Sequence, residues 1–298
     1  MRLIVNATPY ADPPGGAGLR ARYLYGALQE RGHELLFCMA EDTPADLAPP
    51  GAEVRRLPVR AGDPLRRFLR LRLPDEGDVL LTDHYPVGAI PTIVTLHDLG
   101  GGAVRRALIR RCARRAAAAV AVSRTVAEAW GVEADVVPNG FDPPRRRPAT
   151  EGGGALLVSD PGLQHKNVPV AREAARLVGL PVREVGRGAR WLGRDDMQRA
   201  IAGARAVLCP SRREGFGMLA LEAMALGVPV VASDIPAHRE VLGDVGHYAP
   251  LDDVAAFADA IRGAVGGDSE RLARGRARAR RFTWDEAARK LDAILRRL

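Results

Sequence analysis

The sequence predicts an α/β fold made of two doubly wound, Rossmann-like domains that face a central cleft. In both halves of the chain, short apolar runs alternate with stretches of helical period, which is typical of parallel βαβ units. The alternation is interrupted at residues 142–154, where proline, charged residues and glycine occur without apolar periodicity. A chain of 298 residues is long enough for two domains that each bury a core. Ligands of such folds bind at the carboxyl ends of the strands, so the functional motifs are expected there.

The expected elements divide the chain into an N-terminal domain at residues 1–141, a linker at residues 142–154 and a C-terminal domain at residues 155–298. The N-terminal strands are expected at residues 2–7, 35–40, 79–82, 92–96, 120–123 and 136–138, and the helices at residues 19–31, 104–118 and 124–130. The C-terminal strands are expected at residues 155–159, 182–185, 206–210 and 228–232, and the helices at residues 168–178, 195–203, 218–226, 254–265, 269–281 and 284–298. A return of the last helix to the N-terminal domain is compatible with this pattern.

The composition is that of a globular chain, with 47% hydrophobic and 27% charged residues. The net charge of +8 comes from arginine, because Lys166 and Lys290 are the only lysines, and such a bias is typical of a GC-rich bacterial genome. Cys38, Cys112 and Cys209 lie far apart in apolar stretches, so neither disulfides nor a thiolate metal site is expected. A reducing, cytoplasmic compartment fits these features.

No membrane span or secretory leader is expected. The chain starts directly with the apolar run at residues 2–7, and the most apolar run, residues 116–122, is far shorter than the roughly 20 residues of a spanning helix. Two basic segments, residues 66–74 and 105–115, are expected as solvated faces. Contact with an anionic acceptor or with the inner membrane face is the alternative. Nucleic acid is not an expected partner, because no aromatic platform accompanies the charge.

The strongest functional motif is PSRREGFGMLALEAMALGVPVVAS at residues 210–233. A buried strand is followed by a loop with two glycines and by a helix that begins near Met218, where backbone N–H groups and the helix dipole favour a diphosphate. Glu214 in the loop and Glu222 just beyond the first helical turn can face one pocket and accept hydrogen bonds from sugar hydroxyls. The alternative is two turn glycines and a solvated Glu222. The donor-binding residues expected here are Gly215, Phe216, Gly217, Met218, Leu219 and Glu222.

A second motif, GLQHKN at residues 162–167, follows the first expected strand of the C-terminal domain. Lys166 is conspicuous in a chain that otherwise uses arginine, and its compact ammonium can neutralise a leaving diphosphate. A solvated lysine without a partner is the alternative.

A third motif, WLGRDDMQ at residues 191–198, places Asp195 and Asp196 at the start of a helix. N-capping is the first interpretation of these aspartates. Recognition of the donor base is the second, in which a carboxylate would suit the donors of guanine better than the acceptors of uracil.

Two N-terminal features lie at strand ends. Gly15, Gly16, Ala17 and Gly18 join the first strand to the first helix, where backbone can approach a phosphate or an acceptor. His97 and Asp98 close a buried strand. A histidine at such a place is either structural or part of the reaction site.

Metal catalysis finds no support in the sequence. No two aspartates are separated by a single residue, and the six histidines show no ligand spacing with cysteine or with one another. No cofactor is expected, and the helix dipole and Lys166 would stabilise the leaving group instead.

The motif at residues 210–233 resembles the nucleotide-sugar site of the retaining glycosyltransferases of family 4, which have the GT-B architecture of two facing Rossmann-like domains. The resemblance extends from residue 155 to the last helix and is weaker in the N-terminal half. It implies that Glu214 contacts hydroxyls of the donor sugar, that Glu222 contacts the ribose and that backbone at residues 215–219 surrounds the diphosphate. It further implies that His97 lines the reacting sugar, with Asp98 on the acceptor side.

The resemblance also assigns Lys166 to the diphosphate, often together with an arginine several residues earlier. Asp160 or Pro161 occupies that earlier place, so the arginine is absent from its usual position.

The predicted function is therefore a retaining, metal-independent glycosyltransferase that moves a hexose-type sugar from a UDP- or GDP-sugar to an unidentified acceptor. A nucleotide-sugar epimerase or hydrolase of the same architecture is one alternative. A non-catalytic nucleotide-sugar-binding subunit is the other.

Overall fold

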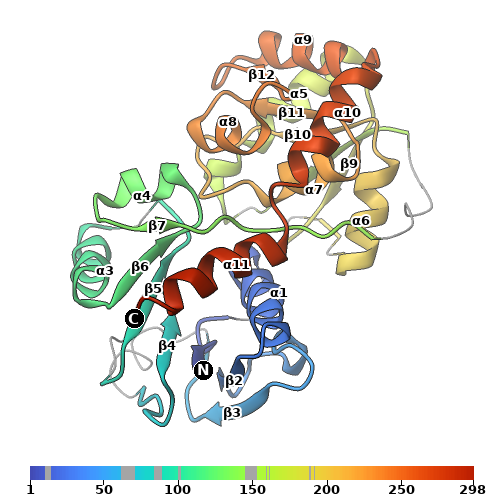
Figure 1. Cartoon of the computed structure of the whole chain (residues 1–298). Helices are drawn as coiled ribbons and strands as arrows, with labels where there is room; N and C mark the ends of the chain where they lie inside the picture. Colours follow the sequence, from blue (N-terminus) through green and yellow to red (C-terminus); the bar gives the residue numbers. More distant parts are fainter. Residues whose placement is uncertain are drawn as a thin grey trace. The chain divides into compact units, whose positions relative to one another are not determined.

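The computed structural model describes residues 1–10, 15–61, 71–83, 89–99, 102–144 and 153–298, apart from residues 159, 161, 188 and 191. The chain forms two compact units, one of Met1–Gly140 with Thr283–Leu298 and one of Phe141–Phe282 (Figure 1). Most of the expected linker and residues 66–70 of the first basic segment lie outside the described residues.

Unit 1 contains a sheet of seven strands in the order β3-β2-β1-β4-β5-β6-β7. All its pairs are parallel, and the order reverses direction between β1 and β4, as in a doubly wound fold. The strands are β1 Arg2–Asn6, β2 Glu34–Ala40, β3 Glu53–Leu57, β4 Val79–Thr82, β5 Thr92–Leu96, β6 Ala118–Ala121 and β7 Asp135–Val136. Strands β4 and β5 are buried along their whole length, because helices and loops cover both faces of a parallel sheet.

The helices of unit 1 are α1 Gly16–Glu30, η1 Ala45–Leu47, α3 Ala103–Arg115, α4 Arg124–Trp130 and α11 Trp284–Leu295. Helix α4 is bounded by standard caps: Ser123 Oγ accepts a hydrogen bond from Val126 N at 3.0 Å, and Gly131 ends the helix with a φ of 59°.

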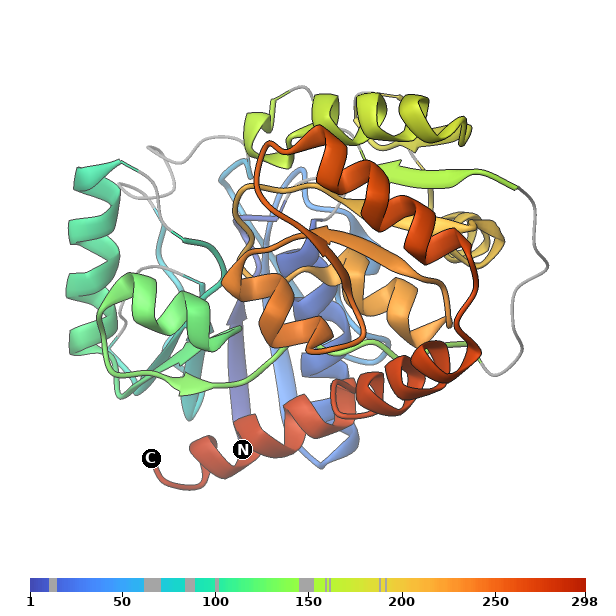
Figure 2. The same ribbon diagram turned by 90° about the horizontal axis from the view of Figure 1, so that it is seen from above.

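Unit 2 contains a parallel sheet of five strands in the order β12-β11-β10-β8-β9. The strands are β8 Ala155–Val158, β9 Val182–Val185, β10 Ala206–Cys209, β11 Val230–Ser233 and β12 His247–Ala249. The helices are η2 Gln164–Lys166, α5 Val168–Val178, α6 Arg194–Gly203, α7 Met218–Ala225, α8 Pro236–Leu242, α9 Val254–Val265 and α10 Ser269–Ala279. Helices α5 and α9 lie side by side (Figure 2) and share a core with β8 and β10 that includes Leu157, Leu208 and Phe257.

These two sheets confirm the predicted α/β fold with two Rossmann-like, doubly wound domains. Some elements were predicted wrongly. The alanines at residues 116–118 were assigned to a helix, but α3 ends at Arg115 and β6 begins at Ala118, because pairing with β5 outweighs the helix propensity of alanine. Strands β3 and β12 and helix α8 were not predicted; β3, with the sequence EVRRL, lacks the apolar run of a buried strand, and β12 has only three residues.

No helix in the described residues combines the length and the apolar character that a membrane span requires. Within the same residues, no three histidine, cysteine, aspartate or glutamate side chains gather into a group that could hold a metal ion.

Helix α11 packs on α1 within unit 1, although the whole of unit 2 lies between them in the sequence (Figures 1 and 2). The ring of Trp284 stacks on Tyr23 with a centroid distance of 6.0 Å. Further along α11, His33 Nε2 lies 3.0 Å from Asp292 Oδ1 in a buried pair. The apolar face of α11 is buried as well, Leu291 included.

We expect Leu291→Ala to lower the free energy of unfolding of unit 1 by about 2–5 kcal/mol, because a buried leucine side chain leaves a cavity when it is truncated. Urea unfolding of purified protein measures the change. The exposed neighbour Arg289 supplies the control: Arg289→Ala should stay within about 0.5 kcal/mol of wild type. Equal stability of the two variants would contradict the packing of α11 on α1.

Candidate active site

Two loops of unit 2 carry the strongest predicted residues. Lys166 follows β8, Glu214 follows β10, and these two strands are direct neighbours in the sheet. Their carboxyl ends therefore meet at one edge, although the two residues lie 48 positions apart. Lys166 Nζ donates a hydrogen bond of 2.7 Å to Glu214 Oε1. The alternative of a solvated lysine without a partner is wrong.

The carboxylate of Glu214 is ionised and held in place. Its Oε1 also accepts a hydrogen bond of 2.7 Å from Ser211 Oγ. Burial alone would raise the pKa of Glu214, but the charge and hydrogen bond of Lys166, with the bond from Ser211, hold this pKa below its ordinary value. Both members of the pair are only partly exposed, at 27% for the Lys166 side chain and 17% for that of Glu214. The pair thus presents a fixed ammonium at the end of the strands.

The glycine loop leads into an uncapped helix start. Gly217 precedes α7 with a φ of 98°, a conformation that glycine adopts without steric cost, and no side chain caps the first N–H groups of the helix. Phe216 is buried and packs edge-on against Phe282, with ring centroids 5.9 Å apart. The start of α7 therefore offers donors to an anion on a firmly anchored loop. Met218 and Leu219, its first residues, are half-buried.

Glu222 lies on α7 in a different environment from Glu214. It is buried, and Arg194 Nη1 lies 3.9 Å from Glu222 Oε1, which is beyond hydrogen-bonding distance. Burial raises the pKa of Glu222 to about 7, and Arg194 offsets only part of this shift. The guanidinium of Arg194 itself stacks over the ring of Phe141 at 5.5 Å. The alternative in which Glu222 is a solvated helix residue is wrong.

Asp195 and Asp196 lie in the first turn of α6, but neither is its cap. The helix begins one residue earlier than expected, so its cap position falls on Gly193, which provides no side-chain hydrogen bond. Asp196 instead pairs with Arg199 one turn further on. The N-capping interpretation is therefore wrong, whereas base recognition stays a prediction. Asp160, at the place where an arginine was missing, accepts a hydrogen bond of 3.0 Å from Gly162 N.

In unit 1, Gly15 and Gly16 start α1 without an unusual backbone conformation. Gly15 has a φ of −74°, a side chain there would meet no atom within 4 Å, and Gly16 is the first, exposed residue of the helix. The geometry of the turn thus does not require glycine at position 15, and a role of Gly16 in binding stays a prediction.

His97 and Asp98 follow β5 and have different partners. His97 Nε2 lies 2.8 Å from Asp83 Oδ1, but the geometry of this contact is not that of a hydrogen bond. Asp98 is held by Arg105 of α3 through contacts of 2.9 and 3.3 Å. Sequence analysis missed Asp83, a buried carboxylate that also accepts a hydrogen bond from Tyr10. Asp83 follows β4 directly, so a search for polar residues at the ends of buried strands, which identified His97, could also have found Asp83.

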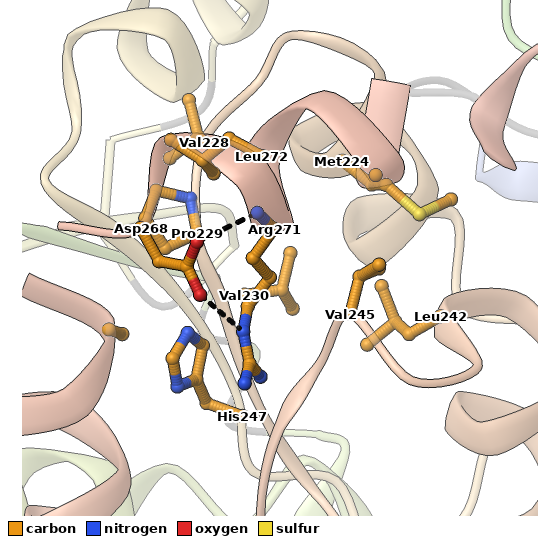
Figure 3. A pocket seen from close by; sticks show the side chains of 12 residues that line it. Met224, Val228, Pro229, Val230, Leu242, Val245, His247, Asp268, Arg271 and Leu272 are labelled. Carbon is orange, nitrogen blue, oxygen red and sulfur yellow. Dashed lines mark hydrogen bonds and ion pairs between the residues drawn. The ribbon is translucent and has the colours of Figure 1, made fainter. Parts of the chain in front are cut away.

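A hollow of unit 2 lies away from these residues, between α7, α10 and the strands β11 and β12 (Figure 3). Apolar side chains such as Met224 and Leu272 line it, and Arg271 and Asp268 pair at its edge. Its volume of about 20 Å³ holds about one water molecule. None of the predicted site residues lines this hollow, which is too small for a nucleotide.

Two family models match the chain. The model described as "Glycosyltransferase Family 4" matches residues 14–145, and the model described as "Glycosyl transferases group 1" matches residues 168–266. The chain is 42% identical over 102 residues to the O-antigen chain mannosyltransferase B of Escherichia coli. It is 33% identical over 193 residues to the phosphatidyl-myo-inositol mannosyltransferase of Mycolicibacterium smegmatis. These matches span 32% and 53% of this chain, and 27% and 50% of the respective relatives.

Solved structures share the fold over the whole chain. The sucrose-phosphate synthase of Thermosynechococcus elongatus has a TM-score of 0.79 and 16% identity, and covers 100% of this chain with 98% of its own. HepE of Anabaena, solved with UDP and glucose, has a TM-score of 0.79 and 18% identity, and both chains are covered completely. The two sheets and the ordered site at their strand ends thus define a protein of the GT-B class. Within that class, residues 14–145 match a glycosyltransferase family 4 domain and residues 168–266 match a group 1 glycosyltransferase domain.

We expect Glu222→Gln to stabilise the protein at pH 8 by up to roughly 3 kcal/mol, and to have no effect below pH 4.5, which is the ordinary pKa of glutamate. A raised pKa in the folded state means that the wild type loses stability as the pH rises from 4.5 to about 7, whereas glutamine carries no such penalty. Thermal unfolding at a series of pH values measures the difference. Glu214→Gln is the control and should destabilise at pH 8, because the pKa of Glu214 is lowered. A Glu222→Gln protein no more stable than wild type at pH 8 would contradict the burial of this charge.

Proposed function

We propose that the protein is a retaining glycosyltransferase that transfers a hexose-type sugar from a UDP- or GDP-sugar to an acceptor without a metal ion or other cofactor. The observation that carries the proposal is the ordered pair of Lys166 and Glu214 beside the uncapped start of α7. A cation beside the uncapped N-terminus of a helix, at the carboxyl ends of neighbouring strands, suits a diphosphate. The family match supports the same reaction class.

Each residue has a role in this proposal. Lys166 and the backbone at residues 215–219 bind the diphosphate and stabilise its charge as it departs. Glu214 accepts hydrogen bonds from hydroxyls of the sugar, and Glu222 accepts them from the ribose. In unit 1, His97 and Gly16 contact the donor, and Asp98 contacts the acceptor.

In the transfer step, the bond between the anomeric carbon and the phosphate oxygen breaks while the acceptor oxygen bonds to the same face of that carbon. The acceptor proton passes to the departing phosphate oxygen, so the charges balance without a covalent sugar–enzyme intermediate. This front-face course retains the anomeric configuration, and it rests on the family resemblance.

The names of the relatives support a hexose. Two describe mannosyltransferases, and a third, from Nocardioides, describes a D-inositol 3-phosphate glycosyltransferase that is 36% identical over 111 residues. Asp195 and Asp196 in the first turn of α6 favour guanine as the base, since carboxylates accept hydrogen bonds from its N–H groups.

The basic helix α3 supports an anionic acceptor or a lipid surface as a further partner. Arg111, Arg114 and Arg115 are exposed, whereas Arg106 and Arg110 donate hydrogen bonds to backbone oxygens of unit 1. Arg111, Arg114 and Arg115 therefore form an exposed cationic face on α3 that can attract an anionic partner.

Thermal unfolding with GDP, UDP and dTDP, followed by transfer assays with the matching nucleotide-sugars, tests the function, because a bound ligand raises the stability of the folded state. We expect one of these nucleotides to stabilise the protein and its sugar conjugate to be consumed only with an acceptor, also in the presence of EDTA. Release of free or altered sugar from the donor alone would indicate a hydrolase or epimerase. Binding without any turnover would indicate a non-catalytic subunit, and EDTA inactivation reversed by manganese would contradict metal independence.

We expect Lys166→Ala to lower turnover by at least about a hundredfold, as the loss of one preorganised charge at a leaving group commonly does. Steady-state transfer with the donor identified above measures it. Lys290, on α11 of unit 1, is the only other lysine and gives a matched control, for which Lys290→Ala should retain wild-type turnover. Turnover of Lys166→Ala close to wild type would remove Lys166 from the reaction.

Substitution of Glu222 should mainly affect nucleotide binding, whereas substitution of Glu214 should mainly affect the rate of transfer. Glu222→Ala should weaken binding of the free nucleoside diphosphate by about 1.5–3 kcal/mol, because the ribose is present in product and donor alike. Glu214→Ala should leave this affinity unchanged or raise it, since Lys166 loses its competing partner, and should lower the rate of transfer instead. Calorimetric titration and single-turnover transfer measure the two quantities. A loss of affinity that follows Glu214 rather than Glu222 would reverse the proposed donor orientation.

A further inference from the structure

Two residues other than glycine have a positive φ in the described part of the chain: Asn167 at 53° and Asp252 at 61°. They are bonded to each other, because Asn167 Nδ2 donates a hydrogen bond of 3.0 Å to Asp252 Oδ1. Left-handed backbone is unfavourable for a residue with a side chain and persists where the surroundings enforce it. The two left-handed residues are therefore in direct contact through their side chains.

Asn167 directly follows Lys166 and fixes the turn that carries it. Its N–H donates to Gln164 O at 3.1 Å, which closes the turn η2, and its carbonyl accepts from Val170 N at 3.2 Å, which starts α5. Asn167 is itself buried. A displacement of Asn167 would therefore displace the backbone of Lys166.

Asp252 also holds the loop that carries Glu214. Asp252 lies between β12 and α9, and Arg212 donates to its Oδ1 at 2.6 Å and to its Oδ2 at 3.3 Å. Arg212 precedes Glu214 by two residues, and its backbone N–H donates to His165 O at 2.8 Å. One carboxylate thus joins the loops that follow β8 and β10, which are the loops of Lys166 and Glu214.

We propose that Asp252 is a positioning residue that, through Asn167 and Arg212, sets the distance between Lys166 and Glu214 and so shapes the diphosphate site. We call the three side chains Asp252, Asn167 and Arg212 the bracket. The bracket itself follows from contacts within unit 2, and its effect on the diphosphate rests on the proposed function.

Exposure argues against a role of Asp252 in overall stability. The side chains of Asp252 and Arg212 are 54% and 46% exposed, and ion pairs of this kind contribute little to folding. A glycine at position 252 would adopt the observed φ without steric cost. Asp252→Gly therefore removes the carboxylate and relieves the backbone at the same time, which separates positioning from stability.

The first arm of the test needs neither ligand nor activity, because the chain has only two lysines. Brief acetylation with an N-hydroxysuccinimide ester, followed by mass spectrometry of the peptides, reports the reactivity of Lys166 with Lys290 as an internal reference. In Asp252→Gly we expect Lys166 to react at least about threefold faster than in wild type, as coupling energies within such networks imply, with Lys290 unchanged. Arg212→Gln should give the same increase, and the double variant should add nothing to it.

The second arm measures the affinity for inorganic pyrophosphate, which probes the diphosphate site without a sugar or a base. Asp252→Gly should bind pyrophosphate about tenfold more weakly than wild type while its melting temperature stays equal or rises. Asp252→Asn keeps one oxygen that can accept the bonds from Asn167 and from Nη2 of Arg212 but loses the acceptor for Nε of Arg212, so it should recover part of this affinity. Asp259→Asn is the matched control, because Asp259 pairs with an arginine on the surface of α9 without joining two loops.

Unchanged reactivity of Lys166 in Asp252→Gly would contradict the proposed positioning role of Asp252. A loss of affinity for pyrophosphate that appears only together with a fall in melting temperature would contradict it as well. If the wild type binds neither pyrophosphate nor any nucleoside diphosphate, the proposed function fails, while the labelling arm still decides on the bracket.

Discussion

The pair of Lys166 and Glu214 depends on the parallel pairing of β8 with β10. Parallel strands bring their carboxyl ends to the same edge of a sheet, so loops that are distant in sequence become neighbours. The site of unit 2 uses this constraint repeatedly: the loops after β8, β10 and β12 each contribute a charged side chain to one connected group. Any change in the register of these strands would separate the charges.

The two glutamates of unit 2 show how the same side chain acquires different properties from its surroundings. Glu214 has an ammonium and a hydroxyl as partners, which favour its ionised form despite partial burial. Glu222 is buried with only a distant guanidinium, so its proton is held up to a pH of about 7. A buried carboxyl of this kind can lose its proton when hydroxyl groups of a ligand donate hydrogen bonds to it, because such bonds stabilise the ionised form.

Much of this could be predicted from the sequence, because it depends on local chemistry. The alternation of strands and helices gives the fold class, and glycines with charged residues at strand ends indicate the loops of Lys166 and Glu214. The errors have a different origin. Ala118 and Ala119 have no local preference for a strand, so the strand was predicted to start at residue 120, and only pairing with β5 defines its actual start.

The partners of the site residues were also beyond sequence analysis. Asp83 faces His97 and Asp252 faces Asn167 through contacts between segments that no local pattern connects. The pKa of Glu222 likewise depends on burial, which the helical pattern alone does not give for a polar residue. Such tertiary contacts arise only in the folded chain.

The assignment of α11 to unit 1 has a consequence for biosynthesis. Unit 2 is a continuous stretch, Phe141–Phe282, whereas unit 1 lacks one of its helices until Thr283–Leu298 has been translated. A ribosome delivers the chain from the N-terminus, and domains fold as they emerge. Unit 2 can therefore complete its sheet and helices before α11 has packed on α1. Unit 1 is thus the first unit whose synthesis begins and the last whose chain is complete.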